Sequence, residues 1–213
     1  MHQFIKQNRD YFLMYFTLLI TTLSLLILVN KGDEVIWLNQ FYTPNKNVFF
    51  VFATKLGEEW VALIIGLIIL FTQPYKTVLG YLAMALTISL LTYAFKHFIF
   101  EDAMRPRIFL KEYPLNFVNG LYINSNNSFP SGHTAAAFSC FSYWAYTIEN
   151  KWKFVFLIFP VLVGLSRVYL AQHFLIDVVA GSVLGVSTSI FFYRLFNGTR
   201  FSNSVALNKK LLK

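Results

Sequence analysis

Charged residues are scarce in this sequence, making up 13% of its 213 residues, whereas 56% of the residues are hydrophobic. A soluble domain of this length needs about a quarter of its residues charged to cover its surface. The shortage excludes an ordinary water-facing exterior and favours one that faces lipid. Internal repeats, low-complexity tracts and Ser/Gly-rich linkers are also missing, so residues 1–213 are expected to form a single membrane-embedded domain.

Cysteine occurs only once, as Cys140, so an intrachain disulfide is excluded and cysteine usage does not indicate a redox compartment. Acidic residues are also few, ten against 18 Lys and Arg, and the net charge is +8. Such a balance could indicate nucleic-acid binding. The basic residues are scattered at the ends of apolar segments, however, which is typical of membrane topology. We therefore expect a lipid bilayer as partner and no nucleic acid, with the oligomeric state unknown.

Long apolar segments are abundant, and a span of the hydrocarbon core needs about 20 mostly apolar residues. The first segment is too long for a cleaved signal and no small-residue cleavage site follows it, so we interpret it as a retained helix. The predicted fold is an all-α integral membrane bundle of six transmembrane helices, with one long loop, Glu101 to Pro130, after the third. The predicted spans are roughly Tyr11–Val29, Phe50–Phe71, Thr77–Phe100, Thr134–Tyr146 extended to about Ile148, Phe154–Val168 and Phe174–Phe196.

The turn between the last two predicted spans carries an ionisable cluster. His173 and Asp177 are four residues apart, so on a helix they share a face and can form a hydrogen bond. A carboxylate behind an imidazole fixes its tautomer and leaves the other nitrogen free to attack or to carry a proton. Arg167 comes six residues earlier, and serves the same site only if the chain turns in between. The alternative is a structural His–Asp pair with an arginine at the membrane edge.

Two further clusters lie where predicted helices meet an aqueous face. In Pro130-Ser131-Gly132-His133, Ser131 suits a helix N-cap, and the backbone N–H groups beside Gly132 suit an anion. Capping alone is the simpler interpretation of this tetrapeptide. The third span ends with Lys96, and Arg105 follows in the long loop; these side chains bind phosphate oxygens well, although a solvated basic loop would look the same. Together, the three clusters supply a nucleophile, a general acid and oxyanion stabilisers for phosphoryl transfer.

These motifs resemble those of the type 2 phosphatidic acid phosphatase family, membrane lipid phosphatases that share a site with vanadium haloperoxidases. The family pattern is Lys, six residues, Arg-Pro; then Pro-Ser-Gly-His; then Ser-Arg, five residues, His, three residues, Asp. The second and third motifs match in full, over a resemblance that covers about residues 50–195. The first departs from the pattern, because eight residues separate Lys96 from Arg105-Pro106.

The resemblance implies a role for each motif residue. His173 is the expected nucleophile, Asp177 orients it, and His133 protonates the leaving group. Substrate phosphate is held by the remaining residues, with no metal and no cofactor expected. These substrate-binding residues are Lys96, Arg105, Ser131, Gly132 and Arg167.

The expected activity is removal of phosphate from a lipid phosphate or pyrophosphate through a phosphohistidine. Undecaprenyl pyrophosphate, phosphatidylglycerol phosphate, phosphatidic acid and lipid A remain open as substrates. A lipid phosphotransferase with the same site is an alternative, and a non-enzymatic transporter or structural protein is disfavoured by the clustering of ionisable residues. Ten of the 18 Lys and Arg residues fall on the side of the predicted termini. We therefore expect a bacterial plasma membrane protein with cytoplasmic termini and an outward-facing site.

Overall fold

The structure is a computed structural model that describes residues 2–121, 124–149, 151–198 and 204–212. Every regular element in these ranges is a helix, so the predicted all-α class is confirmed for the described part of the chain. The elements are α1 (His2–Gln7), α2 (Arg9–Leu28), α3 (Asp33–Asn39), α4 (Pro44–Lys55), α5 (Glu59–Thr72), α6 (Tyr75–Ala94), the π-helix η1 (Phe95–Ile99), α7 (Pro106–Phe109), α8 (Gly132–Thr147), the 3-10 helix η2 (Lys151–Leu157), α9 (Ile158–Tyr169) and α10 (Leu175–Asn197).

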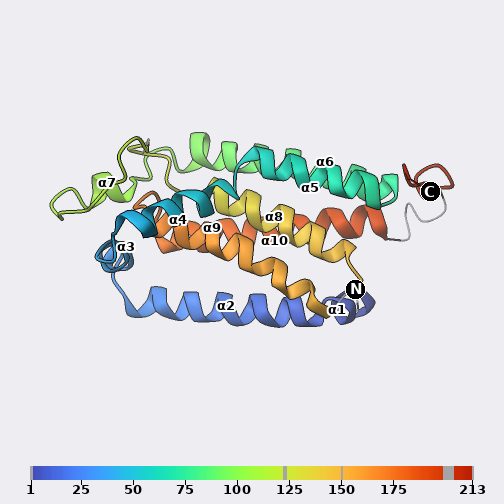
Figure 1. Cartoon of the computed structure of the whole chain (residues 1–213), viewed down its shortest axis with the longest axis horizontal. Helices are drawn as coiled ribbons and strands as arrows, with labels where there is room; N and C mark the ends of the chain where they lie inside the picture. Colours follow the sequence, from blue (N-terminus) through green and yellow to red (C-terminus); the bar gives the residue numbers. More distant parts are fainter. Residues whose placement is uncertain (1, 122–123, 150, 199–203, 213) are drawn as a thin grey trace.

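The long helices run side by side along one axis, and both ends of the chain lie at the same end of the bundle (Figure 1). The short helices α3 and α7 lie at the opposite end, together with the long loop that contains α7 (Figure 1). Large apolar side chains cover much of the outside, as on α2, where Ile27 is 85% exposed and Leu28 80% exposed. An apolar surface of this extent fits contact with lipid.

Among the described residues, four segments are long and apolar enough to cross a bilayer, namely Arg9–Leu28, Tyr75–Ile99, Lys151–Tyr169 and Leu175–Asn197. Helix α5 is apolar but shorter, and α8 has 16 residues. The structure therefore supports an integral membrane protein, while the count of six spans stays a prediction.

The second predicted span, Phe50–Phe71, is not one continuous helix. It is divided into α4 and α5 by a break that contains Gly57. At this break the chain passes so close to α8 that a Cβ on Gly57 would lie 2.8 Å from the carbonyl oxygen of His133. The apolar pattern predicted one continuous span here, which is wrong, and the break leaves Thr54 at the end of α4 in contact with Arg167.

Helix α8 is the central element of the bundle, since eleven of its 16 residues are buried. Gly181 and Gly185, one turn apart on α10, pack directly against it. A Cβ on Gly181 would lie 2.6 Å from Ser131 O, and one on Gly185 would lie 2.5 Å from Ala135 O. Small residues at this spacing let two helix backbones approach closely within a membrane. The contact fixes the start of α8 against the first turns of α10.

Candidate active site

The turn between α9 and α10 brings Arg167 and His173 to one site. Helix α9 ends at Tyr169, and the backbone N–H groups of Gln172 and His173 both donate to Arg167 O, at 3.0 and 3.2 Å. The charge on Arg167 acts directly on the His173 imidazole. The turn that the spacing required is therefore present.

Asp177 lies in the first turn of α10, with its Oδ2 3.3 Å from His173 Nδ1. The same oxygen accepts hydrogen bonds from Phe174 N at 3.0 Å and from Ser128 Oγ at 2.5 Å. His173 is 1% exposed and Asp177 is 3% exposed. The predicted His–Asp pair is thus formed, and Ser128 is a third partner that the motifs did not predict.

His173 is held in its neutral form. Burial keeps the pKa of its imidazole well below the usual range, because charging a side chain away from water costs solvation energy. The positive charges of Arg167, Arg105 and Lys96 lower this pKa further. A neutral imidazole whose Nδ1–H points at a carboxylate has an unprotonated Nε2, and this nitrogen is available as a nucleophile.

Arg167 presents a buried donor to the site. Its Nη1 donates to Thr54 Oγ1 in α4 at 2.7 Å, a contact that the sequence did not reveal. Its Nε is buried and has no hydrogen-bond partner among the residues that the structure describes. Because an unsatisfied donor on a buried cation is unfavourable, an anion placed here would be strongly stabilised.

Arg105 is 6% exposed and reaches the same region from the long loop. Its guanidinium donates to the backbone carbonyl oxygens of Asn126 at 3.1 Å, Gln172 at 3.3 Å and Asn127 at 3.5 Å. Burial lowers its pKa, and the opposing effect of the Asp177 charge raises it. The loop and the His173 turn are therefore joined through this one cation.

Ser131 is the N-cap of α8, as predicted, and its Oγ accepts from Thr134 N at 3.5 Å. Its own backbone N–H donates to Asp177 O at 3.0 Å, which ties the start of α8 to α10. Gly132 opens the helix, and His133 follows within reach of the charges of Arg167, Lys96 and Arg105. The start of this helix therefore lies beside the cationic cluster, and its backbone amides suit an anion bound there.

Lys96 also reaches the site despite its longer spacing from Arg105. A Cβ built on Gly132 would lie 3.8 Å from Lys96 Nζ, and the charges of Arg105 and Arg167 act on this ammonium. Lys96 lies in the π-helix η1, where each turn contains an extra residue. The additional residues before Arg105 are accommodated in this wide turn and in the exposed turn at Glu101–Asp102.

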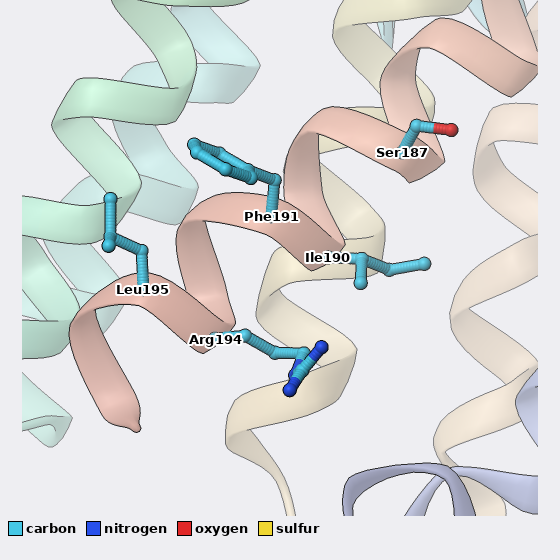
Figure 2. Close-up of a pocket in the computed structure, with 5 residues that line it drawn as sticks. All are labelled: Ser187, Ile190, Phe191, Arg194 and Leu195. Carbon is cyan, nitrogen blue, oxygen red and sulfur yellow. The ribbon is translucent and has the colours of Figure 1, made fainter. Parts of the chain in front are cut away.

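A pocket of about 520 Å³ lies along α10 toward its C-terminus (Figure 2). Its lining begins at Ser187, ten residues after Asp177 and therefore about 15 Å further along the helix. Arg194 is the only ionisable side chain in this lining, and it has no acidic or nucleophilic partner there. The pocket lacks the groups needed for phosphoryl transfer, so the candidate active site is the cluster around His173.

Comparisons with known proteins identify relatives of this chain. The model of the PAP2 superfamily matches residues 77–201. An undecaprenyl-diphosphatase of Sulfolobus acidocaldarius is 29% identical in an alignment of 191 positions that covers 83% of this chain and 87% of that protein. The bacitracin transport permease protein BcrC of Bacillus licheniformis is 35% identical over 68 residues, covering 32% of this chain and 33% of that protein.

Two solved structures share the fold. LpxE of Aquifex aeolicus has a TM-score of 0.67 and 24% identity, covering 77% of this chain and 94% of that one. The transmembrane PAP2 type phosphatidylglycerolphosphate phosphatase of Bacillus subtilis has a TM-score of 0.65 and 24% identity, covering 92% of this chain and 98% of that one. The family match covers more than half of the chain and contains all three motif clusters. The chain therefore belongs to the PAP2 superfamily of membrane lipid phosphatases.

Proposed function

We propose that this protein hydrolyses a lipid diphosphate, with undecaprenyl diphosphate as the leading substrate. The similarity to an undecaprenyl-diphosphatase supports this choice, because it extends over most of both chains. The observation that carries the proposal is a neutral, carboxylate-backed His173 beside the unpaired Nε of Arg167. This arrangement places a nucleophile next to a buried group that stabilises an anion.

The first chemical step is attack by His173. Its Nε2 lone pair forms a bond to the terminal phosphorus while the bridging P–O bond breaks. His133 donates its proton to the leaving oxygen, so the product is a lipid monophosphate. The imidazolium that forms at His173 is stabilised by Asp177 through Nδ1–H, as in other carboxylate–histidine pairs.

The second step releases phosphate. His133, now neutral, takes a proton from water, which attacks the phosphohistidine and breaks the P–N bond. Throughout, the phosphate oxygens are held by five groups of the site. These groups are the side chains of Lys96, Arg105, Ser131 and Arg167 and the backbone amide of Gly132.

A substrate panel tests the proposal. Phosphate release by the purified protein is measured with undecaprenyl diphosphate, phosphatidylglycerol phosphate, phosphatidic acid and lipid A, with His173→Ala as the control. We expect the highest kcat/KM for undecaprenyl diphosphate and no release by the control. A higher kcat/KM for another lipid would reject this substrate, and lipid conversion without free phosphate would identify a phosphotransferase.

We also propose that the chain crosses the membrane six times, with cytoplasmic termini and an outward-facing site. The shared position of both ends in Figure 1 is compatible with an even number of spans. Ten of the 18 Lys and Arg residues, but only two of the ten acidic residues, would then be cytoplasmic. Two of these ten basic residues, Arg200 and Lys213, lie outside the described residues. In a Cys140→Ser background, a cysteine at Asn126 should react with an impermeant maleimide in intact cells. Reaction only after permeabilisation would reverse the orientation.

A further inference from the structure

Asp177 has a closer partner than the histidine it is expected to orient. Its Oδ2 lies 2.5 Å from Ser128 Oγ but 3.3 Å from His173 Nδ1. Ser128 Oγ is itself 3.4 Å from His173 Nδ1. Nδ1 of His173 therefore has two oxygens near it, Asp177 Oδ2 and Ser128 Oγ, and these two oxygens are hydrogen-bonded to each other. Because an ionised carboxylate only accepts, the hydroxyl proton belongs to the bond with Asp177.

Ser128 is held at this point from both sides. It is 1% exposed, and its backbone N–H donates to Ala103 O at 2.9 Å, two residues before Arg105. Three residues later, the backbone N–H of Ser131 donates to Asp177 O. The long loop thus delivers the Ser128 hydroxyl to Asp177 between two backbone anchors, and a shift of this side chain would move the carboxylate.

We propose that Ser128 is a positioning residue for the nucleophile His173, acting through Asp177. A carboxylate that is 3% exposed needs donors to stay ionised, and the Ser128 hydroxyl is the nearest of its three. The same hydroxyl fixes which way Oδ2 faces, and offers a second acceptor to Nδ1–H. Both effects keep Nε2 unprotonated and directed at the phosphate.

Kinetics of Ser128 variants test this role, which rests on the proposed hydrolysis. Ser128→Ala should lower kcat about 10- to 30-fold with KM nearly unchanged, since one charge-assisted hydrogen bond is lost but no group that touches substrate. Ser128→Thr, which keeps the hydroxyl, should recover most of the rate. Ser128→Cys, with its weak donor, should fall between them. The graded series remains informative if one variant is poorly folded.

A double variant separates positioning from general structural damage. In an Asp177→Asn background, Ser128→Ala should cost less than about threefold, because its effect depends on the carboxylate. Ser142→Ala is the matched control, since this buried serine bonds Tyr11 at 2.6 Å in another part of the bundle. We expect it to lower the Tm but not kcat.

Three results would overturn the inference: an unchanged kcat for Ser128→Ala, the same loss in both backgrounds, or no recovery with threonine. Failure of the proposed function is a separate outcome. In that case the wild-type protein itself would release no phosphate from undecaprenyl diphosphate.

Discussion

Replacing Lys96 with alanine tests the motif that departs most from the family pattern. In the structure Lys96 Nζ lies beside Gly132, at the start of α8, and is half-buried near Arg105 and Arg167. One charge-assisted bond to phosphate contributes about 1.5–3 kcal/mol. The lower part of that range applies to a partly exposed group, so we take about 2 kcal/mol, a loss of about thirtyfold in kcat/KM.

The same substitution should not destabilise the fold. Arg105 and Arg167 repel the ammonium in the free protein, so its removal relieves a like-charge interaction. We expect the Tm of Lys96→Ala in detergent to be equal to or above the wild-type value while the activity falls. This opposite response of activity and stability is the signature of a residue kept for ligand binding.

The assay is the initial rate of phosphate release from undecaprenyl diphosphate, with the Tm measured on the same preparations. Lys96→Arg should keep most of the activity because it keeps the charge. Lys111→Ala, which removes an exposed lysine from the same long loop, is the matched control and should behave as wild type. An unimpaired Lys96→Ala variant beside an inactive Arg105→Ala variant would refute the proposed role of Lys96.

The remaining predictions concern the reaction itself. His173→Ala should abolish turnover, whereas Asp177→Asn should leave a measurable rate, since loss of an orienting group costs less than loss of the nucleophile; an Asp177→Asn rate equal to wild type would disprove the pairing. EDTA should leave the rate unchanged, because cationic side chains and backbone amides stabilise the phosphate charge without a metal. Vanadate, which can adopt the five-coordinate phosphoryl geometry, should inhibit. Loss of activity with EDTA that magnesium or zinc restores would show a metal requirement. A plot of kcat/KM against pH should have its acid limb below pH 6.5, because the pKa of His173 is lowered and the imidazole stays neutral to lower pH. Burial and the charges of Arg167, Lys96 and Arg105 also lower the pKa of His133, to about 3, in the free protein, so His133 gains its proton only with the phosphate anion bound, and the basic limb should appear in kcat. An acid limb at 6.5, or a flat kcat profile with limiting chemistry, would contradict this assignment.

The spacing of residues along single helices was the most predictive feature of the sequence. The four-residue interval between His173 and Asp177 predicted their contact, and Ser131 before an apolar helix predicted an N-cap. Both features depend on local helix geometry, which the sequence specifies directly.

Features that depend on contacts between distant segments were not predictable. At the break, Gly57 passes close to His133 in α8 and Val163 in α9, and nothing in the local sequence indicates that approach. Thr54 and Ser128 become partners of Arg167 and Asp177 only after the bundle assembles. Eight residues separate Lys96 from Arg105, two more than in the family pattern. The wide turn of the π-helix helps to accommodate this longer spacing, and a π-helix has no clear sequence signal.

Trapping the covalent intermediate is the most direct test of the central claim. Enzyme mixed with undecaprenyl diphosphate labelled with ³²P in its terminal phosphate is quenched in alkali, which preserves phosphohistidine, and the labelled peptide is identified. We predict label on His173 in the wild-type enzyme quenched during turnover, and none in His173→Ala. Label on His133, or turnover by His173→Ala, would contradict the account.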